Sequence, residues 1–248
     1  MSSLYLNESL HPDAFEPGRR LPVGGADARH ATQVARVRTG ERVAVGDGRG
    51  RLAWGPVVHI GSGEFAIAAE EIVVEAPRAP RLVLVQALAK GDRDELAIQA
   101  ATELGVDAVV PWQAARSVSR WAGPKADKGV ERWRAVVREA TKQAIRPTVP
   151  EVRELVDTRG LLGLVGAGEV LVLEPTARSP IVATLADIAS SSGELLLVVG
   201  PEGGIAPEEL VQLEAAGARP VRLGPEVLRT STAGPAALAV LAALLGRW

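Results

Sequence analysis

The sequence predicts an α/β protein built on a parallel sheet, with a small all-β unit in front of it. From residue 82 onward, short apolar runs alternate with helical patterns, as in a parallel sheet covered by helices. Before residue 75, short β-like runs are joined by Gly/Asp turns instead. Between the two parts, Pro77 and Pro80 interrupt both periodicities. We therefore expect domains over residues 1–74 and 82–248, joined by a linker over 75–81.

The β unit contains a glycine-rich run with two possible interpretations. Residues 42–45 and 51–54 flank Gly46-Asp47-Gly48-Arg49-Gly50, and a further strand over 64–68 follows a Gly-Ser-Gly turn. The run superficially suggests a phosphate-binding loop. It lacks the G-x-G-x-x-G spacing, however, and it lies between two strands rather than before a helix. The pattern therefore predicts a hairpin turn.

The second part alternates regularly between strands and helices. Apolar runs predict strands over residues 82–87, 106–112, 170–173, 195–199 and 220–223. Helical spacing predicts helices over residues 93–104, 125–145, 181–189, 207–216 and 235–245. Gly105 and Gly217 are suited to end two of these helices, and Pro147 follows the long one.

Composition excludes several classes of protein. The 248 residues include no cysteine, which excludes a disulfide scaffold, a thiolate metal site and a cysteine nucleophile. His11, His30 and His59 lack metal-ligand spacing, so we expect no metal. The N-terminus does not resemble a secretory signal. The longest apolar stretch, 235–246, is about half the ~20 residues of a membrane span. We expect a cytoplasmic protein without a membrane partner.

The near-neutral net charge of −2 conceals two basic segments. Eight arginines face three acids over residues 19–51, and nine basic residues face three acids over 112–148. From residue 160 onward, five arginines face nine acids. The two segments are compatible with a polyanion bound on one face, although an arginine-rich surface can also serve solubility alone.

The loops that follow three strands are the best candidates for a site, because ligands of open α/β sheets bind at the carboxyl ends of the strands. These loops are residues 174–176, 200–204 and 224–234. Glycines in the second loop would let the backbone approach a flat ligand closely. The alternative is a plain turn from strand to helix. In the third loop, Thr230, Ser231 or Thr232 is expected to cap the last helix, with Arg229 near the same sheet edge.

Several motifs in the chain resemble those of a known family. Leu195-Leu-Leu-Val-Val-Gly-Pro-Glu-Gly-Gly204, followed by Leu223-Gly224 and Val227-Leu228-Arg229-Thr230-x-Thr232-Ala233, resembles the RsmE-like 16S ribosomal RNA uridine-N3 methyltransferases of the SPOUT superfamily. Further similar stretches are Ala89–Asp92, Ala101–Val106 with Arg116-Ser117-Val118, and Gln143-x-x-Arg146-Pro147-x-x-Pro150. The first domain is similar to that family's PUA-like RNA-binding domain.

This resemblance implies a trefoil-knotted α/β catalytic domain, an S-adenosylmethionine pocket made by the knotted loops, and a homodimer. It implies methylation of N3 of a specific uridine in 16S ribosomal RNA. The partner that presents this uridine is the RNA itself or the small ribosomal subunit. The alternatives are methylation of another RNA position or of a ribose 2′-hydroxyl, and a catalytically silent RNA-binding protein. The expected cofactor-binding residues are Glu174, Gly200, Glu202, Gly203, Gly204, Leu223, Gly224, Leu228, Thr230, Thr232 and Ala233.

Arginines are the expected substrate-binding groups. We expect Arg229 to stabilise the charge that spreads onto the uracil oxygens, with Arg146 and Gln143 contributing RNA or substrate contacts. The expected RNA-binding residues are Arg19, Arg20, Arg29, His30, Arg36, Arg38, Arg116 and Arg120. The family commonly has Arg-Thr-Glu-Thr-Ala where this chain has Ser231, so the resemblance assigns no proton acceptor at that position.

Overall fold

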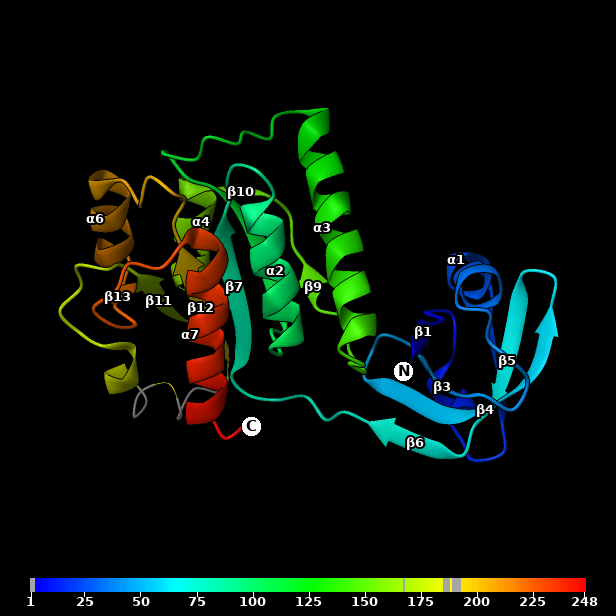
Figure 1. Ribbon diagram of the computed structural model, residues 1–248. Helices are drawn as coiled ribbons and strands as arrows, with labels where there is room; N and C mark the ends of the chain where they lie inside the picture. The colour runs from blue at the N-terminus through cyan, green and yellow to red at the C-terminus, as the bar shows by residue number, and fades with distance from the viewer. Residues whose placement is uncertain (1–2, 167, 185–187, 189–192) are drawn as a thin grey trace. The chain divides into compact units, whose positions relative to one another are not determined.

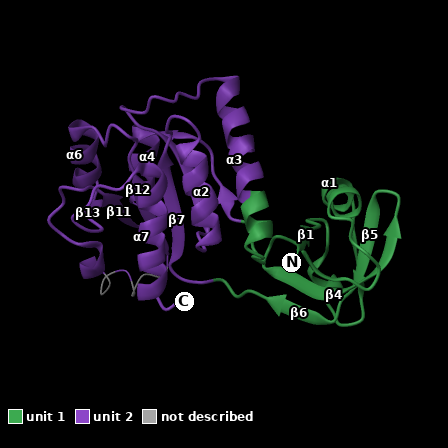
Figure 2. Cartoon of the chain, in the orientation of Figure 1, with its two compact units in different colours: residues 1–77, 138–149 green, residues 78–137, 150–248 purple. Residues whose placement is uncertain are grey.

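The chain forms two compact units, which Figure 2 shows in different colours. The structure, a computed structural model, describes residues 3–166, 168–184, 188 and 193–248. Unit 1 comprises residues 1–77 and 138–149, and unit 2 comprises residues 78–137 and 150–248. The sequence division places residues 138–149 with the second domain, whereas this segment packs in unit 1. The domain boundaries themselves stay a prediction.

Unit 1 is a six-stranded sheet in the order β1-β3-β4-β5-β2, with β6 paired to β4. Its strands are β1 (Leu4–Leu6), β2 (Arg20–Val23), β3 (Arg42–Gly46), β4 (Arg51–Gly61), β5 (Glu64–Ala68) and β6 (Glu71–Val74). Short helices are η1 (Pro12–Ala14), α1 (Gly25–Arg29) and η2 (His30–Val34). The core lies around Tyr5, Phe65 and Ile67, with the first two rings packed edge to face.

The glycine-rich run 46–50 connects β3 to β4 as a hairpin, as predicted. Asp47 is fully buried, and its Oδ1 atom accepts hydrogen bonds from the N–H groups of Arg49 at 2.7 Å and Arg51 at 3.0 Å. The aspartate thus satisfies the turn's own backbone donors. A phosphate-binding role for this loop is not needed to explain its composition.

A buried aspartate explains why residues 138–149 belong to unit 1. Asp27 is 4% exposed and accepts two hydrogen bonds from the Arg138 guanidinium, at 3.0 and 3.1 Å. Lys142 and the N–H of Leu6 complete its shell at 3.2 and 2.8 Å. Burial alone would raise the pKa of Asp27, but these hydrogen bonds and positive charges hold it below its ordinary value of 3.8.

We expect this cluster to make folding pH-dependent in acid. A carboxyl whose pKa is lowered by folding stabilises the protein above its unfolded pKa, and this contribution is lost as the pH falls through the folded pKa. The free energy of unfolding, measured in urea, should therefore fall more steeply below about pH 4 for the parent than for Asp27→Asn. Arg138→Met should cost about 3 kcal/mol at neutral pH, because the buried carboxylate loses two charge-assisted hydrogen bonds and keeps only those from Lys142 and the Leu6 N–H. Parallel pH curves for parent and Asp27→Asn would contradict this assignment.

Unit 2 is a parallel sheet in the order β10-β8-β7-β12-β11-β13, with β9 paired to β8. Its strands are β7 (Arg81–Ala87), β8 (Ala108–Gln113), β9 (Glu151–Val152), β10 (Val156–Asp157), β11 (Glu169–Leu173), β12 (Glu194–Val199) and β13 (Arg219–Val221). The parallel sheet is thus confirmed, and the five predicted strands are present with ends shifted by one or two residues. The implied trefoil knot stays a prediction.

Helices cover both faces of this sheet (Figure 1). The helices of unit 2 are α2 (Arg93–Glu103), α4 (Thr158–Val165), η3 (Ile181–Thr184), α6 (Pro207–Ala215) and α7 (Thr230–Leu244). Helix α3 (Pro124–Gln143) begins in unit 2, and its residues from 138 onward belong to unit 1. Helices α2 and α7 pack together on one face, and α4 and α6 pack on the other. On the α4/α6 face, Leu161 and Leu213 join a core that includes Val83, Val85 and Val198. Gly105 and Gly217 follow α2 and α6 with φ of +93° and +109°, as a helix-ending glycine should.

The predicted start of the last helix at residue 235 is wrong. Helix α7 begins at Thr230, so Pro235 lies inside it. The backbone of Arg229 occupies the N-cap position, and its carbonyl accepts from the N–H groups of Thr232 and Ala233 at 2.8 and 2.9 Å. The predicted side-chain cap is also wrong, because Thr230, Ser231 and Thr232 all lie within α7 and its N-cap residue makes no side-chain capping hydrogen bond.

Other differences concern short elements. The sequence patterns did not predict α4, β9 or β10, which are eight residues long or fewer. Of the helix predicted over 181–189, residues 181–184 form η3, and residues 185–187 and 189 lie outside the described residues. In the part of the chain that the structure describes, no helix has the length and apolar character of a membrane span.

Candidate active site

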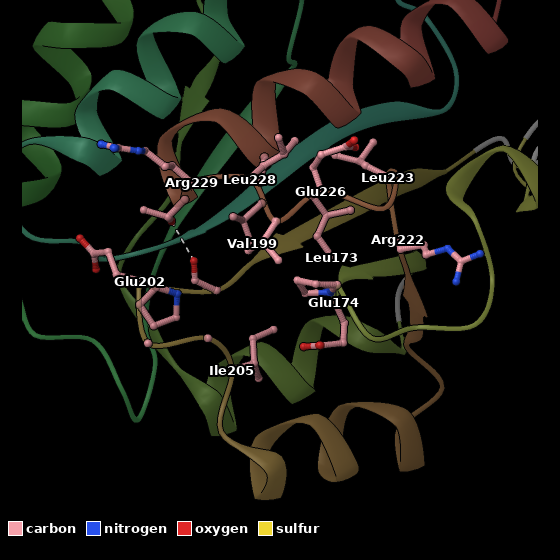
Figure 3. Close-up of a pocket in the computed structure, with 18 of the residues that line it drawn as sticks. Leu173, Glu174, Val199, Glu202, Ile205, Arg222, Leu223, Glu226, Leu228 and Arg229 are labelled. Atoms are coloured by element: carbon pink, nitrogen blue, oxygen red, sulfur yellow. Dashed lines mark hydrogen bonds between the residues drawn. The ribbon is translucent and has the colours of Figure 1, made fainter.

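Three loops at the carboxyl edge of the unit 2 sheet enclose a pocket of about 620 Å³ (Figure 3). They follow β11, β12 and β13, which are neighbours in the sheet. These are the loops singled out from the sequence. The lining residues are Arg93, Leu173, Glu174, Pro175, Val199, Gly200, Pro201, Glu202, Gly203, Gly204, Ile205, Val221, Arg222, Leu223, Gly224, Glu226, Val227, Leu228, Arg229, Thr230 and Ala233.

Most of the expected cofactor-binding residues share this one pocket. Ten of the eleven are among its lining residues, from Glu174 to Ala233. The exception is Thr232, which is exposed and whose N–H is used at the start of α7. What each of these residues binds stays a prediction.

The loop after β12 is held in shape by packing and by a hydrogen-bonded threonine. A Cβ atom on Gly200 would lie 2.7 Å from Cγ1 of Ile205, so only glycine fits there. The Thr230 hydroxyl donates to the Gly200 carbonyl at 2.8 Å and accepts from Nε2 of Gln86 at 2.9 Å. Thr230 therefore connects the start of α7 to the ends of β12 and β7.

Glu202 joins the same loop to the segment that follows β7. Its Oε1 atom accepts from the N–H of Lys90 at 3.0 Å and from the Arg93 guanidinium at 2.9 Å. Burial alone would raise the pKa of Glu202, but hydrogen bonds from its own N–H, from Lys90 and from Arg93 hold the pKa below its ordinary value. The Glu202 carboxylate is thus ionised at neutral pH and acts as a structural acceptor.

Arg229 is the pocket arginine whose guanidinium is available to a ligand. Its side chain is exposed and has no hydrogen-bond or ion-pair partner among the described residues. Arg222 differs, because Nη1 donates to the Ala177 carbonyl at 3.3 Å. Figure 3 shows Arg229 and Glu202 on one side of the pocket and Arg222 on the other. Arg229 therefore lies on the side of the pocket nearer β7 and α2.

Two of the residues expected to bind RNA also donate hydrogen bonds to the backbone around the site. Arg116 donates to the Gly203 carbonyl at 3.0 Å, and Arg120 donates to the Ala115 carbonyl at 2.8 Å. The buried Glu209 carboxylate accepts from the Ala115 N–H at 2.8 Å and from the Thr158 hydroxyl at 2.5 Å. The segment after β8 is thereby held against the Gly200 loop. The role of Arg116 and Arg120 in RNA binding stays a prediction.

The remaining expected residues belong to unit 1. Gln143 is the last residue of α3, and Arg146 lies three residues after it. Neither residue lines the pocket. The basic side chains at 19, 20, 29, 30, 36 and 38 are all exposed, and Arg19 pairs with Glu16 at 3.1 Å. Among the residues described, no group of histidine and carboxylate side chains could hold a metal ion.

Several pocket residues were not identified from the sequence. Arg93 is the first residue of α2 and reaches the pocket although it lies more than a hundred residues before the Gly200 loop. Leu173, Val199, Ile205 and Val221 provide apolar walls. In the sequence, Leu173, Val199 and Val221 read as ordinary strand residues, and Ile205 as a residue between the glycine loop and the next helix. Only their position next to the predicted loops could have indicated them.

Comparisons with known proteins match most of the chain. Residues 76–242 match the family described as RNA methyltransferase domain, and residues 23–68 match the RNA methyltransferase PUA domain. The chain is 47% identical over 239 residues to ribosomal RNA small subunit methyltransferase E of Mycobacterium bovis, covering 94% of this chain and 90% of that protein. The Bacillus subtilis protein of the same name is 30% identical, with coverage of 94% and 93%.

A solved structure shows the same architecture throughout. Ribosomal RNA small subunit methyltransferase E from Neisseria gonorrhoeae, bound to S-adenosyl methionine, superimposes with a TM-score of 0.83. It is 27% identical in sequence, and the match covers 98% of both chains. The chain therefore belongs to the RNA methyltransferase family that its motifs around Gly200 and Arg229 indicate, that of the ribosomal RNA small subunit methyltransferase E proteins.

Proposed function

We propose that this protein transfers the methyl group of S-adenosylmethionine to N3 of a uridine in 16S ribosomal RNA. The observation that carries the proposal is the 620 Å³ pocket, which brings the glycine loop, Arg229 and nearly all expected cofactor-binding residues together. The name and cofactor of the Neisseria gonorrhoeae relative support the same activity. The family resemblance supplies the target atom.

The pocket suits a nucleoside cofactor in size and chemistry. Its volume lies within the usual range for small-molecule sites, and Leu173, Val199 and Ile205 offer apolar surface to a base. The glycine loop lets the backbone N–H groups approach a planar ligand. Glu174 and Glu226 contribute negative charge toward a cation, whereas the Glu202 carboxylate is paired with Arg93. Bound S-adenosylmethionine supplies an electrophilic methyl group on a sulfonium.

The protein's own contribution is electrostatic. Uracil N3 is a weak nucleophile while it carries its proton, so the proton must pass to a water molecule or a carboxylate as the N3–methyl bond forms and the S–methyl bond breaks. The site must favour the resulting anion, whose charge spreads onto the flanking carbonyl oxygens. The Arg229 guanidinium, which has no partner in the part of the chain that the structure describes, can donate to those oxygens. Gln143 and Arg146 would add RNA contacts from unit 1.

The proposed substrate also defines the cellular partners. The enzyme would act in the cytoplasm, where small ribosomal subunits are assembled, and the exposed basic side chains of unit 1 would contact the RNA backbone. The family resemblance adds a homodimer, which sedimentation of the purified protein would test.

Titration of the protein with S-adenosylmethionine by calorimetry tests the cofactor assignment. We expect saturable binding at one site per chain. A catalytically silent RNA-binding protein of the same fold would give no binding heat, and that result would remove the basis of the proposal.

A further inference from the structure

A second cavity, of about 360 Å³, lies at the same sheet edge as the cofactor pocket. It is built from the segments that follow β7 and β8, and β7 neighbours β12 in the sheet. The lining residues are Ala89, Gly91, Asp92, Asp94, Glu95, Ser119, Trp121, Lys125, Lys128, Gly129 and Arg132. The function proposed above assigns this cavity no role.

The two cavities share one wall. Arg93 lines the cofactor pocket, whereas Asp92 and Asp94 on either side of it line the second cavity. Glu202 fixes this wall through the Lys90 N–H and the Arg93 guanidinium. A ligand in the second cavity would therefore lie one short segment away from the reacting groups.

The carboxylates of the second cavity are engaged within the protein. Asp94 accepts from the N–H groups of Ala89 at 3.1 Å and Glu95 at 2.9 Å. Glu95 in turn binds the Arg132 guanidinium, with Nη2 to Oε2 at 2.9 Å. The Asp92 carboxylate lies 3.7 Å from the same guanidinium.

The two lysines of the second cavity differ from its carboxylates. Lys125 and Lys128 are exposed at the start of α3, and neither side chain has a hydrogen-bond or ion-pair partner among the described residues. Their charges remain available to an anion. The carboxylates already accept hydrogen bonds or lie beside Arg132, whereas the two ammonium groups lack a partner among the described residues and can bind a phosphate group.

An indole ring completes the cavity. Trp121 is half-buried, and its ring packs so closely on Gly129 that a Cβ there would lie 2.5 Å away. It packs edge to face with Trp133, with ring centroids 5.6 Å apart. The indole is therefore fixed in place while part of it lines the cavity. Fixed aromatic rings beside basic groups are how proteins hold single-stranded nucleotides.

We propose that the second cavity binds a nucleotide of the substrate RNA next to the target uridine. Its base stacks on Trp121, and its phosphate lies against Lys125 and Lys128. The shared wall places this nucleotide beside the cofactor pocket, so the cavity positions the RNA strand as well as adding affinity. The inference rests on the proposed function, because it takes RNA as the substrate.

The double variant Lys125→Ser/Lys128→Ser tests the phosphate contact. Binding of a fluorescein-labelled oligouridylate is measured by anisotropy at several salt concentrations, and S-adenosylmethionine binding is measured by calorimetry. We expect weaker RNA binding, with a salt slope lower by about 0.7 for each lysine. Cofactor affinity should not change. The matched control is Arg159→Ser/Arg178→Ser, which removes two exposed charges of unit 2 that have no partner among the described residues.

Trp121 provides an independent test of stacking. Trp121→Leu should weaken oligouridylate binding by about tenfold, and Trp121→Phe should retain most of the affinity. Circular dichroism establishes that each variant is folded. Wild-type affinity and salt slope in the folded lysine variant, or equal affinities for the leucine and phenylalanine variants, would overturn the proposal.

The failure of the inference can be distinguished from failure of the proposed function. If the parent methylates ribosomal RNA while the cavity variants bind and methylate normally, the cavity has no RNA role and the function stands. If the parent binds the oligouridylate through this cavity but methylates no ribosomal RNA, the site stands and the activity is wrong.

Discussion

Arg229→Ala is expected to lower the rate of methylation by about two to three orders of magnitude, while the affinity for S-adenosylmethionine changes little. The guanidinium lines the pocket and has no side-chain partner in the described part of the chain. Only the backbone of Arg229 supports α7, through its carbonyl. Its truncation should therefore remove stabilisation of the uracil anion without disturbing the fold.

The measurement is kcat for small ribosomal subunits from a strain lacking the enzyme, together with calorimetric cofactor binding. Arg159→Ala is the matched control, because it removes an exposed arginine on α4 and should behave as the parent. Arg229→Lys should recover part of the rate, since it restores the charge but not the bidentate geometry. An unchanged kcat in Arg229→Ala would exclude the proposed role.

Gly200→Ala is expected to weaken S-adenosylmethionine binding, and methylation at limiting cofactor should fall in proportion. The added Cβ would lie 2.7 Å from Ile205 Cγ1 and 3.2 Å from its backbone nitrogen, so the loop must move. Overpacking of this kind costs about 1–3 kcal/mol, which corresponds to roughly 5- to 150-fold in affinity if the loop must return to its native shape to bind.

The appropriate control is another glycine in the same unit. Gly163 lies within α4, and a Cβ there would meet no atom within 4 Å. Gly163→Ala should therefore bind the cofactor as the parent does, with equal or slightly greater stability. Parent-like cofactor affinity in Gly200→Ala would show that the pocket tolerates a rearranged loop.

The sequence predicted the sheet and the three pocket loops well, because both depend on local patterns. Apolar runs such as residues 195–199 encode buried parallel strands, and a loop after such a strand must lie at the carboxyl edge. The start of α7 was missed for a non-local reason. The Thr230 hydroxyl bonds to Gly200 and Gln86, which are distant in sequence, so it cannot serve as the expected cap.

The net charge of a sequence segment also fails to reveal contacts between residues that are distant in sequence. The basic segment 112–148 includes Arg132 and Arg138, which are paired with Glu95 and Asp27. Because those acids lie outside the segment, its local excess overstates the charge available to RNA. The pairing that puts 138–149 in unit 1 is equally invisible to periodicity. Which basic side chains of the segment lack a partner, as Lys125 and Lys128 do among the described residues, depends on contacts that the sequence does not reveal.

Mapping the methylated nucleotides of 16S ribosomal RNA by mass spectrometry tests the central claim most directly. RNA from a strain lacking this gene is compared with RNA from the same strain carrying either the parent gene or the Arg229→Ala variant. We predict that one uridine gains a single methyl group on N3 with the parent and stays unmodified with the variant. A methyl group on a ribose or on another base, or an unchanged map, would contradict the account.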